Sequence, residues 1–131
     1  MPWVEVFAVF FVCHNVGDYL LQTEFEATNK FGGLGADRTA RRALLGHIAT
    51  YTLAFVPGLI WLSTEAGPSA AAATAIAIAI PHLIQDDGRL LDHYLRHAKR
   101  VSAVATPAVR AVTDQAFHLT TLFITAVAIG S

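Results

Sequence analysis

The amino-acid sequence predicts an all-α polytopic membrane protein, a bundle of four transmembrane helices with an amphipathic helix on its cytoplasmic surface. The first reason is composition. Hydrophobic residues make up 54% of the 131 residues and charged residues only 15%, whereas about a quarter of residues are charged in soluble domains. The second reason is that the apolar residues gather in four long segments, each close to the ~20 residues that cross a bilayer core. The length fits a single membrane domain over residues 1–131.

The predicted spans are the four apolar segments, and two of them contain a proline. Pro57 lies inside the second span, and Pro81 lies near the end of the third, directly before His82. Either proline can kink its helix. The third span is the shortest, and alone it would also fit a buried helix or a strand. Its alternating positions are all apolar and rich in alanine, which favours close helix packing in lipid. The spans cover residues 3–21, 43–62, 69–85 and 109–130.

The positions of the basic residues predict the orientation in the membrane. All nine Lys and Arg residues lie on the connections 23–42 and 87–108 or at their edges. By the positive-inside rule both loops face the cytoplasm, and both termini lie outside a bacterial inner membrane. Charged and apolar residues recur at helical spacing over 89–100, which predicts a helix on the cytoplasmic membrane surface. Anionic lipid headgroups are the partners that these basic loops would bind, and the sequence carries no nucleic-acid signature.

Polar side chains interrupt all four spans, and the predicted topology brings them to one depth. His14, Asp18 and Gln22 are spaced by four, so on a helix they form one stripe. The other three spans carry their histidines and aspartates at the cytoplasmic ends. Seven side chains are therefore expected to meet in the cytoplasmic third of the bilayer: His14, Asp18, His47, His82, Asp86, Asp114 and His118.

A bound metal is the predicted reason for this cluster. An aspartate within a span costs roughly 2.5–3.5 kcal/mol, and a hydrogen bond between helices returns only about 0.6 kcal/mol. A divalent ion can contribute on the order of 10 kcal/mol. Imidazole with carboxylate favours Zn, Mn or Fe, and seven ligands could hold two ions. Gln22, Gln115 and Tyr51 are expected to hydrogen-bond to the ligands.

Two alternatives remain open at this level. The aspartates could be protonated within a metal-free hydrogen-bond network. Each histidine could also be oriented by the aspartate four residues away, which would then not be a ligand itself.

The spacing of these residues resembles a family of small bacterial and phage membrane proteins of unknown function. The resemblance covers nearly the whole chain and implies no established activity. More loosely, the chain resembles membrane-bound proteins described as metal-dependent hydrolases, which implies hydrolysis at a bound metal. The residues that carry the resemblance are His14-x-x-x-Asp18-Tyr-Leu-Leu-Gln22, His47, His82-x-x-x-Asp86 and Asp114-Gln115-x-x-His118.

The predicted function is a membrane-embedded metal-binding protein, and the favoured activity is hydrolysis of a lipid-like or phosphoester substrate at the cytoplasmic interface. The metal would activate water, and Asp18 or Asp114 would act as the general base. The alternatives are a metal or proton transporter, with Thr121 and Thr125 along its path, and a scaffold with a structural metal or polar network. Paired histidines also occur in haem proteins, but the aspartate at each fourth position argues against haem. Whether copies of the chain associate is left open.

Overall fold

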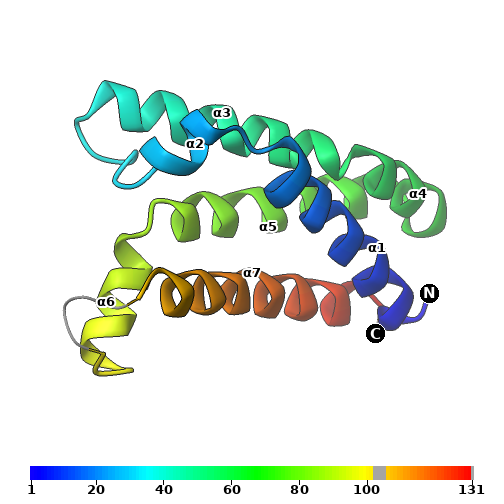
Figure 1. The fold of residues 1–131 in the computed structure, drawn as a ribbon. Helices are drawn as coiled ribbons and strands as arrows, with labels where there is room; N and C mark the ends of the chain where they lie inside the picture. Colours follow the sequence, from blue (N-terminus) through cyan, green and yellow to red (C-terminus); the bar gives the residue numbers. More distant parts are fainter. Residues whose placement is uncertain (102–105, 131) are drawn as a thin grey trace.

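The computed structural model describes residues 1–101 and 106–130, and every regular element in this part of the chain is a helix (Figure 1). The all-α prediction is therefore confirmed. Residues 102–105 of the predicted loop 87–108, and the final residue of the predicted domain, lie outside the described residues. The elements are α1 (Trp3–Asn15), η1 (Val16–Leu21), α2 (Glu24–Asn29), α3 (Arg38–Ala54), α4 (Val56–Ala66), α5 (Pro68–Asp86), α6 (Arg89–His97) and α7 (Pro107–Gly130).

The long helices run back and forth along one direction. Helix α5 contacts both α3 and α7, and α1 packs along α7 (Figure 1). The two termini lie at the same end of the bundle, where Gly130 approaches the backbone of Trp3. The short helix α6 lies at the opposite end, between α5 and α7 in the chain.

Three helical segments are long and apolar enough to cross a membrane, namely Trp3–Leu21, Pro68–Asp86 and Pro107–Gly130. A fourth is counted if α3 and α4 form one span, although they are bent by 48°. The predicted segment 43–62 is thus two helices. The break lies at Phe55, because the Pro57 ring lacks an N–H and collides with the carbonyl four residues earlier. Pro81, in contrast, lies inside α5, which continues to Asp86.

The first helix changes to a π-helix at Val16 and ends at Leu21, and Gln22 is extended. The predicted stripe His14–Asp18–Gln22 is therefore wrong at Gln22. Widened helical turns of this kind are rare and occur often at functional sites. Gly17 allows α3 to pack closely here, since a Cβ atom would lie 2.6 Å from Cδ2 of Tyr51.

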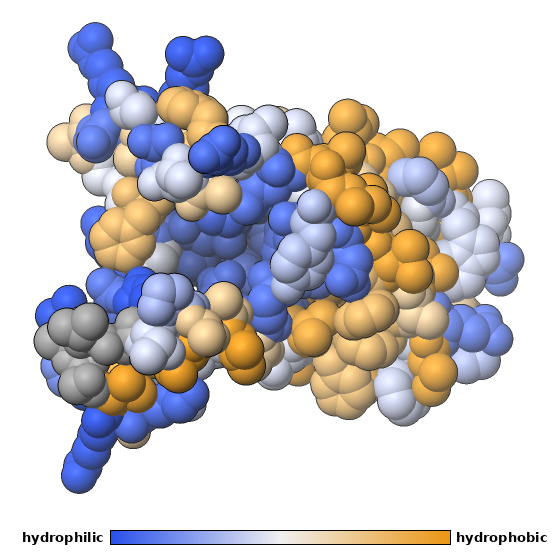
Figure 2. Space-filling model, in the orientation of Figure 1, coloured by the Kyte–Doolittle hydropathy of each residue, from blue (hydrophilic) through white to orange (hydrophobic). Residues whose placement is uncertain are grey.

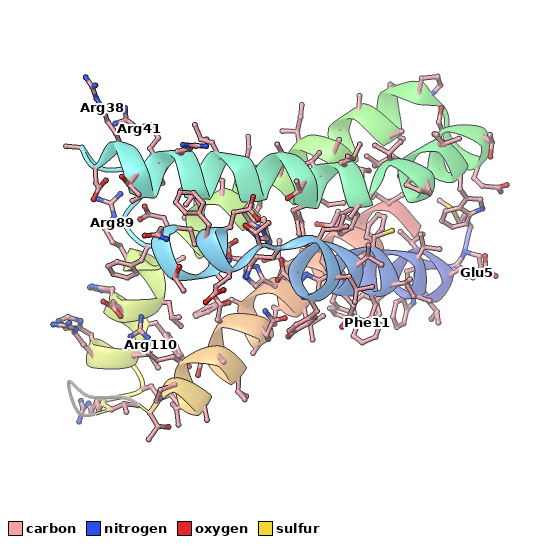
Figure 3. All side chains as sticks on the ribbon, turned by 45° about the horizontal axis from the view of Figure 1, so that its top comes forward. Glu5, Phe11, Arg38, Arg41, Arg89 and Arg110 are labelled. Carbon is pink, nitrogen blue, oxygen red and sulfur yellow. The ribbon has the colours of Figure 1, made fainter. Side chains whose placement is uncertain are left out.

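The two ends of the bundle differ in composition. Hydrophilic side chains project from the end that carries α6 and the start of α3, while apolar residues cover much of the remaining face (Figure 2). The same end carries Arg38, Arg41, Arg89 and Arg110, and Glu5 lies at the opposite end (Figure 3). The apolar core is formed by Val6, Phe10, Cys13, Tyr51, Phe55, Leu62, Ile78, Leu122 and Ala126.

The predicted polar loop 23–42 is folded against the bundle. It contains α2, which packs on α3 and begins with a capping box between Thr23 and Glu26. After α2 the chain meets the turn that follows α5. There Gly88 has a φ of +79°, and a Cβ on it would lie 2.5 Å from the Phe31 ring. Helix α2 and the residues after it therefore cover the polar end of the bundle.

Candidate metal centre

Four side-chain atoms from three helical segments converge between α3, α5 and η1. The Nε2 atoms of His47 and His82 lie 3.1 Å apart. Asp18 Oδ1 lies 3.3 Å from each of these nitrogens. Asp86 Oδ2 lies 2.8 Å from His47 Nε2 and 3.2 Å from His82 Nε2. All four residues are buried.

The second oxygen of Asp86 reaches the fourth histidine. Asp86 Oδ1 lies 3.1 Å from His118 Nε2, and this nitrogen lies 3.4 Å from Asp114 Oδ2. His118 is buried, whereas the Asp114 side chain is 25% exposed. Asp86 thus belongs to two groups of side chains that could each hold an ion: His47–His82–Asp86 and Asp86–Asp114–His118.

His14 belongs to a third such group, with Asp18 and His82. Both of its ring nitrogens already have hydrogen-bond partners. The Tyr51 hydroxyl lies 3.0 Å from Nδ1, and Gln115 Oε1 lies 2.8 Å from Nε2. The Gln115 amide in turn donates to Asp18 Oδ2 at 3.3 Å. Tyr51, His14 and Gln115 therefore form a chain that fixes the Asp18 carboxylate and leaves its Oδ1 directed at the histidine pair.

Six buried side-chain atoms have no hydrogen-bond partner within residues 1–101 and 106–130, and all of them belong to this cluster. Buried polar atoms are nearly always paired in proteins. Asp86 Oδ1 and His118 Nε2, two of these atoms, lie 3.1 Å apart and could share a bound ion. The atoms are Oδ1 of Asp18 and Asp86, Nδ1 of His47, His82 and His118, and Nε2 of His118.

Lys30 is a member of the cluster that the sequence did not reveal. Its Nζ donates to Asp86 Oδ2 at 2.8 Å and to Gln22 Oε1 at 2.7 Å. Gln22 thus reaches the cluster only through Lys30. In the sequence Lys30 was one of nine basic residues on two loops, and only the fold of α2 over the bundle brings its ammonium group to a buried carboxylate. No local pattern would have distinguished it.

Gln85 is a second residue that the sequence analysis did not single out. Its amide donates to Thr121 Oγ1 at 2.8 Å and so links α5 to α7. Its position three residues after His82 places it on the helix face toward the cluster. That spacing was a signal that could have found it.

Asp87 does not belong to the histidine–aspartate cluster, and it holds the residues after α2 in place. Its carboxylate accepts hydrogen bonds from the Leu34 N–H at 2.8 Å and from Arg89 Nε at 2.5 Å. Burial acts to raise the pKa of Asp87, but these hydrogen bonds outweigh it and hold the pKa below the ordinary aspartate value. The carboxylate therefore stays ionised and ties the residues after α2 to the end of α5.

Together, the fold and the site define an all-α protein with membrane-compatible helices and a buried histidine–aspartate cluster that could hold metal ions. The chain belongs to the family described as "Protein of unknown function (DUF3307)", which it matches over residues 6–131. The expected membership of a family of unknown function is thereby confirmed. No curated protein and no solved structure matches the chain.

Proposed function

We propose that this protein is a membrane-embedded hydrolase with two metal ions at the cytoplasmic end of a four-span bundle. The observation that carries the proposal is the convergence of two imidazole nitrogens and two carboxylate oxygens at 2.8 to 3.3 Å. In a tetrahedral site with ligand bonds of about 2.0–2.1 Å, neighbouring ligand atoms lie about 3.3 Å apart. Four of the separations, at 3.1 to 3.3 Å, are close to that value, and the one between Asp86 Oδ2 and His47 Nε2 is shorter at 2.8 Å.

The first ion would be held by Asp18 Oδ1, Asp86 Oδ2 and the Nε2 atoms of His47 and His82. The donor set of two imidazoles and two carboxylates suits Zn, Mn or Fe. His14 would support this ion indirectly. Its hydrogen bonds to Tyr51 and Gln115 would have to break before it could become a ligand.

The second ion would be held by Asp86 Oδ1, His118 Nε2 and Asp114 Oδ2. Asp86 would then contribute one carboxylate oxygen to each ion. Three protein ligands leave coordination positions for water and substrate. Asp114 is the most exposed member, and its second oxygen would accept a proton from that water.

Two metal ions supply an activated water at neutral pH and stabilise negative charge on the substrate. The buried side chains of Asp18, His47, His82 and Asp86 would hold the first ion away from bulk solvent. They also place the site near the basic end of the bundle, where an amphiphilic ester could enter from the membrane surface.

The orientation in the membrane is part of the proposal. Helices α3 and α4 would together form one bent span, and α6 would lie on the cytoplasmic surface with Leu91 and Leu95 facing the bundle. The gathering of arginines at one end supports this orientation (Figure 3). Reporter fusions after Lys30 should read cytoplasmic and fusions at the C-terminus external. The opposite result at the C-terminus would overturn it.

Metal analysis of detergent-purified protein tests the function. Wild type should carry about two equivalents of Zn, Mn or Fe per chain, as the two ligand groups require. His47→Ala should lose at least one equivalent and all metal-dependent turnover of esters. His97→Ala is the matched control, because its ring is exposed and its Nδ1 hydrogen-bonds to the His93 carbonyl within α6.

A metal-free polar network is the competing candidate, and Lys30 favours it. Its ammonium group already places a positive charge 2.8 Å from Asp86. If wild type carries no metal and His47→Ala alters only thermal stability, the network is correct and the hydrolase is wrong.

A further inference from the structure

The polar end of the bundle contains a cavity of about 360 Å³ between α2, α5, α6 and α7. Figure 2 shows this face of the molecule hollowed, with hydrophilic residues inside the hollow. The volume lies in the range of small-molecule sites, ~300–1,000 Å³. Lys30, Asp86, Arg110 and Asp114 give the cavity its charged groups.

Asp86 and Asp114 belong to both the cavity and the second ligand group of the proposed centre. A ligand in this cavity would therefore contact the second ion directly. The cavity is the route by which a substrate could reach the coordination positions that the protein leaves open.

The two cations come from different elements. Lys30 follows α2, and Arg110 lies in the first turn of α7. The Arg110 guanidinium carries five N–H donors, and its contact with Asp92 Oδ1 at 2.5 Å is made by Nη1. An ammonium group and a guanidinium group are the side chains that proteins use to bind phosphate oxygens.

The rest of the lining is apolar. Phe31, Leu91, Pro107 and Ala111 line the cavity between the charged groups. A neutral carboxylic ester would offer no anionic oxygen to Lys30 and Arg110, and a free sugar would not match the apolar lining. A phosphate group attached to a hydrocarbon chain matches both parts.

We infer that this cavity binds the phosphate group of a phosphate ester, with Lys30 and Arg110 holding its oxygens. The inference rests on the proposed metal centre for the hydrolysis step, and the ions would also offset the repulsion between a phosphate and the carboxylates of Asp86 and Asp114. In the reaction the oxygen of water bonds to phosphorus and the ester P–O bond breaks. One water proton passes to Asp114 and then to the departing alcohol oxygen.

The binding of two phosphate probes to metal-loaded protein in neutral maltoside micelles tests this inference. The probes are inorganic phosphate and dihexanoyl phosphatidic acid, each titrated by calorimetry. Lys30→Met and Arg110→Met should each weaken binding about tenfold or more, as expected for charged hydrogen bonds. Lys30→Arg should keep most of the wild-type affinity. This result would show that Lys30→Met weakens binding through loss of the charge and not through misfolding. Arg38→Met removes the same charge outside the cavity and should change affinity less than about twofold.

The two probes distinguish the source of the phosphate. Tighter binding of the lipid than of inorganic phosphate identifies a membrane amphiphile, and equal binding identifies a soluble phosphate compound. Binding that is unchanged in both Lys30→Met and Arg110→Met, or absent in metal-loaded wild type, would overturn the inference.

Metal content of every variant is measured in the same samples, so the two proposals fail separately. If wild type binds metal but not phosphate, the metal centre is supported and the phosphate pocket is refuted. Phosphate binding that depends on Lys30 in protein that carries no metal keeps the pocket and removes the metal centre.

Discussion

The two ends of this bundle satisfy their buried groups in different ways. Near the termini, Phe10 and Phe55 lie against each other with ring centroids 5.9 Å apart, and Leu62, Leu122 and Ala126 complete an apolar core. At the other end four buried histidines face two buried aspartates, and six polar atoms have no partner within the described part of the chain. The first end is complete with protein atoms alone. The second end has side chains that could hold metal ions.

Tyr51 contacts both the apolar core and the histidine–aspartate cluster. Its ring lies 5.0 Å from Phe55 and stacks on His82, with ring centroids 3.4 Å apart and an interplanar angle of 9°. Its hydroxyl lies 3.0 Å from His14 Nδ1. The apolar core therefore holds the histidine rings in position by packing against them through Tyr51. Changes on either side of Tyr51 should separate stability from metal binding.

The largest effect on stability is expected from Phe10→Ala at the apolar end. Phe10 is fully buried, and removal of its ring should cost about 3 kcal/mol, the low end for such changes. The low end applies because lipid chains are as apolar as the core, so the loss is one of packing. Unfolding in sodium dodecyl sulfate measures the change. Metal content of the folded protein should stay at the wild-type value, and its loss would show that the two ends are one unit.

A smaller effect on stability, with a larger one on the metal, is expected from Gly17→Ala. The new Cβ would lie 2.6 Å from Cδ2 and 3.3 Å from Cα of Tyr51. The strain should cost about 1–3 kcal/mol and shift the Tyr51 ring that stacks on His82. Metal affinity, measured by competition with a chromophoric chelator, should fall with stability.

Gly58→Ala is the matched control for this change. Its Cβ would lie 2.8 Å from Cγ1 of Val9, on the apolar side. A similar loss of stability is expected there with no loss of metal affinity. Equal loss of metal in the two variants would contradict the division of the bundle into two ends.

The smallest effect is expected from Tyr51→Phe. The ring and its stacking remain, and only the hydroxyl that contacts His14 Nδ1 is lost. Removal of one buried hydrogen bond should lower stability by about 1 kcal/mol. Metal should stay bound with slightly weaker affinity, because Gln115 still holds the Asp18 carboxylate. Complete loss of metal in this variant would show that metal binding depends on the Tyr51 hydroxyl, which would contradict the indirect role given to His14.

The sequence by itself determined the helices, their apolar character and most of the residues of the cluster. Composition predicted apolar helices, and three helical segments are long and apolar enough to cross a membrane. Four-residue spacing in His14–Asp18, His82–Asp86 and Asp114–His118 predicted polar faces within apolar segments, because residues four apart share one helix face. The predicted topology added His47 to these pairs, and in the structure its Nε2 lies 3.1 Å from that of His82. These are local or one-dimensional properties, which a sequence records directly.

Only the tertiary structure decided which atoms face one another. The π-helix Val16–Leu21 and the extended Gln22 removed Gln22 from the predicted stripe. The bend at Phe55 divided the predicted second span into two helices. The fold of α2 over the bundle brought Lys30 to Asp86, 56 residues away in the chain. The hydrogen bonds of His14 set it apart from the other three histidines. Contacts of this kind depend on how several helices pack together in space, and periodicity along one helix does not encode them.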